Sequence, residues 1–196
     1  MKSLFHLTPA AHRLPAAPAP DWTLFLDRDG VINHAGEGQY ITRPEDFVFL
    51  PGVPGAIARL SQWFGRVIVI TNQQCVGKGL ISPEALDLLH QYMTASLTAA
   101  GGRIDRVYHC PHLAAAGCTC RKPLPGMVLQ AAADDPHINF SKAVFVGDAL
   151  RDLQVGRSQG MVTVFIAPQV PDDEVRPWAD AVFAGLPELA DWVTGR

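Results

Sequence analysis

The chain has 196 residues, of which 48% are hydrophobic and 18% charged, and its formal net charge is −3. Its 16 basic and 19 acidic residues exclude a broadly basic surface of the kind that coats nucleic acid. No apolar run approaches the roughly 18 residues that a membrane span requires, and four cysteines are too few for a disulfide scaffold.

The first part of the chain is rich in alanine and proline. Pro9, Pro15, Pro18 and Pro20 stand among five alanines, and proline interrupts helical hydrogen bonding. The apolar segment after Lys2 is too short for the core of a secretory signal. We therefore expect residues 1–21 to form a flexible extended arm and residues 22–196 to fold as one domain.

From residue 22 onward, short apolar runs alternate with amphipathic stretches. The runs predict strands at 22–26, 67–70, 107–109, 143–146 and 162–166, with a last edge strand at 181–183. Helices are expected at 53–64, 82–100, 125–133, 150–158 and 186–193. This alternation predicts the α/β class, with a doubly wound, three-layer arrangement in which helices cover both faces of a parallel sheet.

Two segments, 31–50 and 110–124, do not fit the alternation. They contain glycine, proline, asparagine and histidine without a clear period, and each follows a predicted strand. Ligands of open parallel sheets bind at the carboxyl ends of the strands. We therefore expect both segments to be functional loops.

Two carboxylates follow the first predicted strand, in the order Asp27-Arg28-Asp29-Gly30. An aspartate in this place can attack phosphorus and form an acyl phosphate. The second aspartate can give a proton to the leaving oxygen and later take one from water. On these residues alone, a tight turn or a calcium-binding loop is an equally good interpretation.

Polar residues also follow later strands. Thr71 and Asn72 end the second predicted strand, and their hydroxyl and amide groups can bind phosphate oxygens. Lys122 offers a positive charge to a phosphoryl group. Asp148 could share Mg²⁺ with Asp27, because Mg²⁺ prefers carboxylate oxygens. Each residue alone has an ordinary explanation as a cap, a solvated lysine or a turn, but their occurrence at successive strand ends favours a phosphate site.

These segments match, in order, the four motifs of the haloacid dehalogenase-like phosphatase superfamily, which the chain resembles from about residue 22 to residue 195. The resemblance implies a Rossmann-like sheet and Mg²⁺-dependent hydrolysis of phosphate esters. It implies that Asp27 is the nucleophile and that Asp29 is the general acid and base, with the backbone carbonyl of Asp29 also reaching Mg²⁺.

The resemblance implies further roles for the later motifs. Thr71, with Asn72, and Lys122 are expected to hold the phosphate, and Asp148 is expected to bind Mg²⁺. Asp152 is expected to orient Lys122 or to support the metal site.

One loop carries a second set of candidate ligands. Cys110, His112, Cys118 and Cys120 supply three thiolates and one imidazole, enough for a closed tetrahedral zinc site. A closed set argues for a structural ion, which would rigidify the loop insertion beside Lys122. Three ordinary thiols with a chance histidine are the alternative, and we interpret Cys75 as a small loop residue outside the set.

The zinc loop makes the chain similar to a zinc-containing group of the superfamily that has no separate cap domain. This group includes phosphatases of heptose bisphosphates and of histidinol phosphate. The segments 29–33 and 40–47 look more like the heptose enzymes, whereas the short gap between His112 and Cys118 looks more like the histidinol-phosphate enzymes. The resemblance favours a heptose 1,7-bisphosphate as substrate and keeps histidinol phosphate as the alternative.

Without a cap domain, substrate selection would fall to the loops at 31–50, 73–80 and 110–124. Arg121 could hold a second phosphate or a substrate hydroxyl, because its planar fork suits bidentate contacts, and Lys78 is a second candidate. We expect a monomeric, cytoplasmic enzyme whose partner is a small phosphorylated molecule, with no nucleic acid or membrane partner. A non-catalytic phosphosugar-binding protein is the hypothesis from another class.

Overall fold

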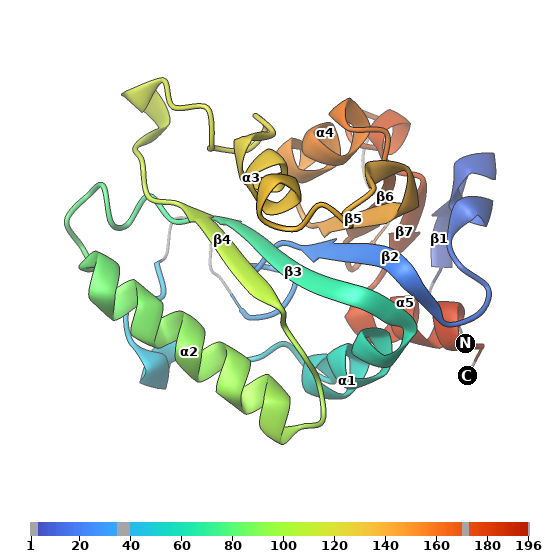
Figure 1. The fold of residues 1–196 in the computed structure, drawn as a ribbon, viewed down its shortest axis with the longest axis horizontal. Coiled ribbons are helices and arrows are strands. Elements are labelled where there is room, and N and C mark those ends of the chain that lie inside the picture. The colour runs from blue at the N-terminus through green and yellow to red at the C-terminus, as the bar shows by residue number, and fades with distance from the viewer. Residues whose placement is uncertain (1–3, 35–39, 170–172, 196) are drawn as a thin grey trace.

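The predicted strands form one seven-stranded sheet in the computed structural model, which describes residues 4–34, 40–169 and 173–195 (Figure 1). The strand order is β1-β7-β6-β5-β2-β3-β4. Every pair from β7 to β4 is parallel, and β1 joins β7 antiparallel. The strands are β1 (Leu4–Leu7), β2 (Ala19–Leu26), β3 (Phe64–Asn72), β4 (Arg106–Cys110), β5 (Ala143–Gly147), β6 (Val162–Ile166) and β7 (Ala181–Phe183).

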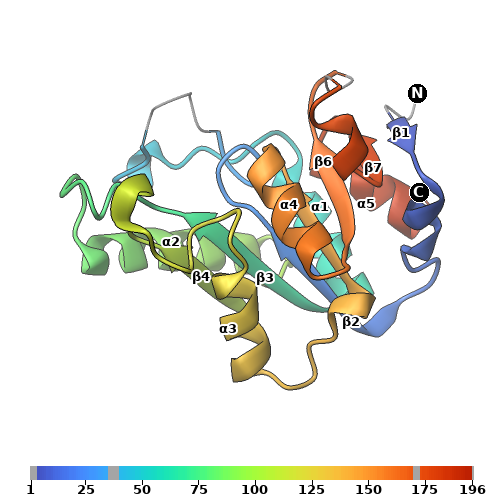
Figure 2. The same cartoon turned by 90° about the horizontal axis from the view of Figure 1, so that it is seen from above.

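Helices cover both faces of the sheet, as Figures 1 and 2 show. One face carries α1 (Val53–Trp63), α2 (Pro83–Ala99) and α5 (Leu186–Thr194), and the other carries α3 (Gly126–Asp134) and α4 (Leu150–Ser158). Short 3₁₀ helices, η1 (Pro9–Arg13), η2 (Pro44–Asp46), η3 (Ala114–Ala116), η4 (Phe140–Lys142) and η5 (Arg176–Trp178), lie in the connections. The predicted α/β fold class is confirmed, and its parallel sheet has six strands.

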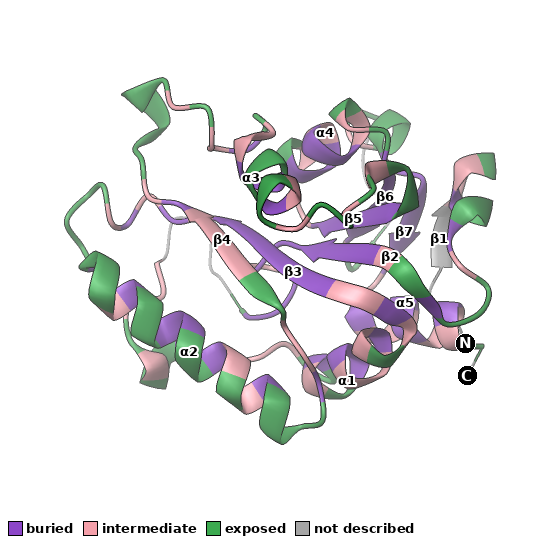
Figure 3. Cartoon of the chain, viewed as in Figure 1, coloured by how far each residue is buried: buried purple, intermediate pink, exposed green. Residues whose placement is uncertain are grey.

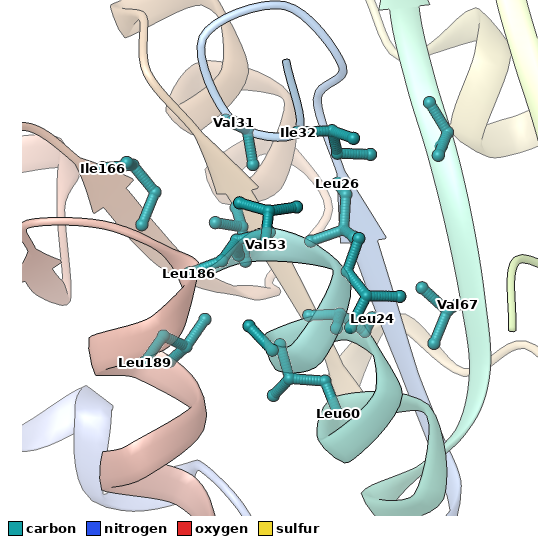
Figure 4. Packing of buried hydrophobic residues seen from close by; sticks show 14 of the residues in the cluster. Leu24, Leu26, Val31, Ile32, Val53, Leu60, Val67, Ile166, Leu186 and Leu189 are labelled. Atoms are coloured by element: carbon teal, nitrogen blue, oxygen red, sulfur yellow. The ribbon is translucent and has the colours of Figure 1, made fainter. Parts of the chain in front are cut away.

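The centre of the sheet is buried from both sides (Figure 3). Leu24 and Leu26 of β2 pack on the side of α1 and α5, whereas Phe25 packs on the side of α3 and α4. Figure 4 shows Leu24 near Leu60 of α1, and Leu26 nearer to Val53 at the start of the same helix. Each such side chain contributes about 1.5 to 3 kcal/mol on burial. The end of β2 is therefore held firmly in place, together with the residues that follow it.

The sheet changes direction around β2. Leu26 pairs with Val69 of β3 on one side and with Val146 of β5 on the other. The chain winds from β2 toward β4, then crosses back to β5 and winds toward β7. Ligand sites of doubly wound sheets lie at such a reversal. Asp27 follows β2 and Asp148 follows the neighbouring strand β5, so both residues lie at this reversal.

Most predicted elements are close to their observed bounds, and Ser82 caps α2 by accepting a hydrogen bond from Ala85 N at 3.1 Å. Two expectations are wrong, and both concern the edge of the sheet where β1 and β7 lie. The strand at 181–183 is not an edge strand, because β1 pairs with it outside. The segment expected to be an extended arm contains β1 and η1, and β2 already starts at Ala19.

The early segment is attached through side chains as well as backbone. Thr8 donates hydrogen bonds from N to Asp180 O at 2.8 Å and from Oγ1 to Asp180 Oδ1 at 3.1 Å. These contacts join positions 172 residues apart, which is why local composition did not predict them. No helix in the part of the chain that the structure describes is long and apolar enough to cross a membrane.

Candidate active site

Asp27 lies directly beyond β2, with 3% of its surface exposed. Its backbone N–H donates to Val146 O at 2.9 Å, which continues the pairing of β2 with β5. Its Oδ1 accepts hydrogen bonds from Arg28 N at 2.7 Å and lies 2.8 Å from Lys122 Nζ. The sheet therefore holds the expected nucleophile against the expected phosphate-binding lysine.

Lys122 is buried, and its ammonium group contacts three oxygen atoms. Its Nζ lies 2.7 Å from Asp152 Oδ1 and donates to Ile70 O at 2.8 Å, in addition to its contact with Asp27. Burial lowers the pKa of Lys122, but the two aspartates raise it further, and the net direction is upward. The ammonium is therefore charged, and Asp152 lies where it can orient it.

Asn72 has a different contact from the one expected. Its Nδ2 donates to Lys122 O at 3.2 Å, and its Oδ1 accepts from Lys122 N at 3.0 Å. Both ends of the amide therefore hold the backbone of the lysine across 50 residues of sequence. Asn72 positions Lys122, while Thr71 lies buried at the end of the same strand.

Three carboxylates crowd the point where the sheet reverses. One oxygen each of Asp27, Asp148 and Asp152 lies within 4.8 Å of the others. Burial and the charges of Asp152 and Asp148 outweigh Lys122 and raise the pKa of Asp27 to about 8. Burial and Asp152 raise the pKa of Asp148 to about 6. Three carboxylates thus face a single lysine, and a bound cation would stabilise their ionised forms.

The donor set fits a magnesium ion. Among the described residues, Asp148 Oδ1 is buried without a hydrogen-bond partner. The Asp148 carboxylate lies over Gly30, where a Cβ would collide with it, and Gly30 has a φ of 81°. Mg²⁺ is bound by one or two carboxylates with water and phosphate oxygens. Asp27 and Asp148 offer such a set.

Asp29 is held by three side chains. Arg28 NH2 donates to its Oδ1 at 2.8 Å and to its Oδ2 at 3.0 Å. Asn33 Nδ2 donates to Oδ1 at 3.0 Å, and Gln73 Nε2 donates to Oδ2 at 2.8 Å. Burial raises the pKa of Asp29, but Arg28 and these hydrogen bonds lower it below the usual range overall. The expected acid and base is thus fixed at both oxygens.

Sequence reasoning did not assign a role to Arg28 or to His90. Arg28 is 1% exposed, and its NH1 lies 3.2 Å from His90 Nε2. His90 lies on the buried face of α2 with Leu86, Leu89 and Met93. A histidine at an inward position of an amphipathic helix was the signal available, and it does not reveal which residue the ring meets.

The expected zinc ligands are brought together at the end of β4. Cys120 Sγ lies 3.1 Å from Cys110 Sγ and 3.2 Å from His112 Nδ1, and Cys118 Sγ lies 3.6 Å from Cys110 Sγ. A tetrahedral zinc ion with bonds of about 2.3 Å separates its sulfur ligands by about 3.8 Å. The sulfur atoms lie somewhat closer together than this, and the donor types and their proximity are those of a group that could hold a structural zinc ion.

The remaining candidates lie on the loops around this centre. Arg121 is partly exposed, and its NH1 approaches His112 O at 3.5 Å. Lys78 is exposed, with Nζ 5.0 Å from the centre of the Tyr40 ring. Cys75 is fully buried and does not belong to the group of expected zinc ligands. Part of the expected substrate loop, residues 35–39, lies outside the described residues.

A cleft of about 530 Å³ opens beside Asp148. Gly30 and Asp148 form one wall, and most other lining residues are apolar, including Leu50, Phe165 and Ile166. Among the charged residues of the centre, Asp148 therefore faces this cleft, whereas the buried Asp27 and Lys122 do not line it.

Comparison with known proteins gives three consistent results. The HAD-hydrolase-like family model matches residues 119–189. A D-glycero-alpha-D-manno-heptose-1,7-bisphosphate 7-phosphatase of Mycobacterium tuberculosis is 37% identical over 86% of this chain and 90% of its own length. The D-glycero-beta-D-manno-heptose-1,7-bisphosphate 7-phosphatase of Bordetella bronchiseptica is 39% identical over 70% of this chain and 75% of its own.

The fold agrees with a solved relative. The crystal structure of the D,D-heptose 1,7-bisphosphate phosphatase from B. bronchiseptica, complexed with magnesium and phosphate, has a TM-score of 0.78 and 31% identity. The match covers 89% of this chain and 98% of that one.

Proposed function

The chain belongs to the haloacid dehalogenase-like phosphatases, and we propose that it removes the 7-phosphate of D-glycero-D-manno-heptose 1,7-bisphosphate. The observation that carries the proposal is the buried pair of Asp27 and Lys122 next to the half-buried Asp148, at the point where the sheet reverses. The relatives named above act on this sugar in its α or β form, which supports the substrate.

The first half of the reaction uses Asp27 as the nucleophile. Its carboxylate attacks phosphorus, the bond from phosphorus to the sugar oxygen breaks, and an aspartyl phosphate forms on Asp27. Asp29 gives the leaving oxygen a proton as it departs. Because its pKa is low in the free protein, Asp29 must first take up this proton from solvent, which the entry of the negatively charged phosphate favours. Lys122 and Thr71 hold the phosphoryl oxygens, with Lys122 supplying a positive charge that is already in place.

The second half returns the enzyme to its starting state. Asp29, now a carboxylate, takes a proton from water, and the water oxygen attacks the phosphorus of the aspartyl phosphate. Inorganic phosphate leaves, and Asp27 is a carboxylate again. The proton that Asp29 gave to the sugar oxygen is thereby replaced.

The proposed metals have separate tasks. Asp27, Asp148 and the Asp29 backbone carbonyl would hold Mg²⁺, which neutralises charge on the phosphoryl group. Cys110, His112, Cys118 and Cys120 would hold a structural Zn²⁺ that fixes the loop carrying Arg121 and Lys122. Arg121 and Lys78 are the proposed contacts for the remainder of the substrate.

We further propose that the enzyme is a cytoplasmic monomer. A sugar bisphosphate carries several negative charges and does not cross a lipid bilayer unaided, so such an enzyme works where its substrate is made. Light scattering combined with size exclusion tests the monomer against its mass of 21.2 kDa. A mass that is twice this value would reject the monomer.

Phosphate release tests the function directly. The purified protein with Mg²⁺ is given the α and β forms of the heptose 1,7-bisphosphate, histidinol phosphate and a panel of sugar monophosphates. We expect the highest kcat/KM with one heptose bisphosphate. A higher value with histidinol phosphate would replace the proposed substrate. Binding of the panel without any phosphate release would favour the non-catalytic hypothesis.

A further inference from the structure

We propose that His90 is a positioning residue that acts through Arg28 to hold Asp29 in place for proton transfer. The inference rests on the proposed function, because it requires Asp29 to be the acid and base. The three residues come from two places in the chain: Arg28 and Asp29 follow β2, and His90 lies on α2, 62 residues beyond Arg28.

The guanidinium of Arg28 connects the other two residues. On one side, NH2 and Nε donate to the Asp29 carboxylate at distances from 2.8 to 3.1 Å. On the other side, NH1 meets His90 Nε2 at 3.2 Å. The guanidinium is planar and rigid, so a contact at one end fixes the orientation of the other end.

The surroundings leave Arg28 little freedom. Its side chain is 1% exposed, and its Cζ lies 5.9 Å from the centre of the Phe47 ring. His90 is 6% exposed. A buried N–H that loses its acceptor costs roughly 1 to 3 kcal/mol, and more when the group is charged. Removal of the His90 acceptor therefore favours movement of Arg28. Asp29 then loses the one partner that contacts both of its oxygens and keeps only Asn33 and Gln73.

The hydrogen bond also determines the state of the imidazole. Arginine is always charged and only donates, so His90 Nε2 must accept, and the ring proton lies on Nδ1. Burial, together with the charges of Arg28 and His109, lowers the pKa of His90 to about 3. The ring is therefore neutral and suited to the acceptor role.

His90 also belongs to a neighbouring group of possible metal ligands. Asp87, His90 and His109 each offer an atom within 4.8 Å of the others. A metal ion on Nε2 would displace the Arg28 hydrogen bond, and one on Nδ1 would have to replace the ring proton close to a guanidinium. We therefore interpret His90 as the acceptor for Arg28 and not as a metal ligand.

The test compares leaving groups of different quality. Loss of proton donation slows release of a sugar alkoxide strongly, but it slows release of p-nitrophenolate little, because that anion is stable without a proton. We expect His90→Leu to lower kcat/KM about 10- to 100-fold on the best sugar phosphate and less than about threefold on p-nitrophenyl phosphate. Asp29→Asn is the reference variant, because it too should lose far more kcat/KM on the sugar phosphate than on p-nitrophenyl phosphate.

Two further variants separate positioning from folding. His90→Gln keeps an acceptor oxygen in reach of Arg28 and should therefore retain most of the activity on the sugar phosphate that His90→Leu loses. Thr94→Ala, one turn along α2, removes a side chain that bonds to His90 O at 3.0 Å and should leave both substrates unaffected. Equal losses on both substrates in His90→Leu, or no loss on either, would overturn the inference.

A second measurement does not depend on turnover. Hydrogen exchange of the Arg28 Nε–H, followed by NMR, should be slow in the original protein and in His90→Gln, and clearly faster in His90→Leu. Unchanged exchange in folded His90→Leu would overturn the inference even if the substrate were misidentified. Conversely, failure of the original protein to release phosphate from any substrate rejects the proposed function and leaves this exchange test in force.

Discussion

Asp27 and Lys122 form an ion pair that is almost completely removed from water, with Oδ1 and Nζ 2.8 Å apart and side-chain exposures of 4% and 1%. A buried pair gains little net stability over apolar residues, but loss of one partner costs about 3 to 5 kcal/mol. The energetic reason for keeping these charges inside is therefore weak. A chemical reason accounts for the pair better: Asp27 attacks a phosphoryl group whose negative charge Lys122 is placed to neutralise.

Replacement of Asp27 by asparagine should abolish turnover and preserve the fold. Asparagine has nearly the same shape and keeps an oxygen that can accept from Arg28 N and Lys122 Nζ, but it cannot form an acyl phosphate. We expect kcat to fall by at least about 10³-fold, with an unchanged circular dichroism spectrum. Residual activity within tenfold of the original would mean that Asp27 is not the nucleophile.

Gly30→Ala should damage the metal site although it replaces none of the side chains proposed to act in the reaction. The new Cβ would collide with the Asp148 carboxylate, and the φ of 81° is unfavourable for alanine. We expect weaker Mg²⁺ activation, measured as an increase of at least about tenfold in the Mg²⁺ concentration for half-maximal rate. Gly79→Ala is the matched control, because Gly79 also has a positive φ of 69° but open space around it. Equal effects in both variants would assign the loss to backbone strain.

The zinc site can be tested with two cysteines of different location. Cys118 lies in the cluster of four ligands, whereas Cys75 is buried elsewhere. Cys118→Ala removes one ligand of a closed tetrahedral set, so we expect elemental analysis to find about one zinc per chain in the original protein and in Cys75→Ala, and much less in Cys118→Ala. Full zinc content in Cys118→Ala would refute the assignment.

Asp180 should be important for stability although it is far from the reaction. Its carboxylate is 1% exposed, lies 2.7 Å from Arg157 NH2 and accepts from Thr163 N at 2.9 Å. Asp180→Ala leaves these donors unpaired and should lower the free energy of unfolding by about 3 kcal/mol. Asp173 pairs with Arg176 at the surface and is 94% exposed, so Asp173→Ala should change stability by less than about 0.5 kcal/mol. Urea denaturation measures both, and similar effects would contradict the argument.

His90 should make the protein sensitive to acid. Its pKa is about 3 when folded against a usual value of 6.5, so between these values the unfolded chain binds more protons than the folded chain. The contribution of His90 to the free energy of unfolding is therefore fully present above pH 6.5. As the pH falls below 6.5, this contribution decreases by up to about 1.4 kcal/mol per pH unit. Arg28, Asp29 and His109 face the ring and remain in His90→Gln.

The corresponding measurement is urea unfolding of the original protein and His90→Gln at several values between pH 7 and pH 5. We expect the difference between their unfolding free energies to shift in favour of His90→Gln as the pH falls. A difference that does not change with pH would show that His90 has an ordinary pKa in the folded state.

Sequence pattern predicted the parts of the molecule whose causes are local. Leu24 to Leu26 and the run around Val67 are apolar throughout because the sheet buries them on both faces, and Pro83 after Ser82 starts α2 for reasons contained in four residues. The aspartates were found because polar residues follow several successive strands, in the order of the four motifs that the chain resembles. Their geometry relative to one another followed from the parallel sheet.

The parts that were not predicted depend on contacts between distant segments. Asn72 looks like a phosphate ligand until Lys122 is placed beside it, and His90 looks like an ordinary core histidine until Arg28 is placed beside it. Neither contact leaves a periodic signal. The pairing of Leu4–Leu7 with Ala181–Phe183 is similar, because proline-rich surroundings hide a short strand whose partner lies near the other end of the chain.

That short strand has a consequence for how copies of the protein meet. A strand at the edge of a sheet presents unpaired N–H and C=O groups, through which two sheets can join into aggregates. β1 pairs with β7 along Leu4 to Leu7, so the apolar strand Ala181–Phe183 is not offered to neighbours. Deletion of residues 4–7, or a bulky fusion that pulls them away, would expose this strand and favour aggregation of an otherwise well-folded enzyme.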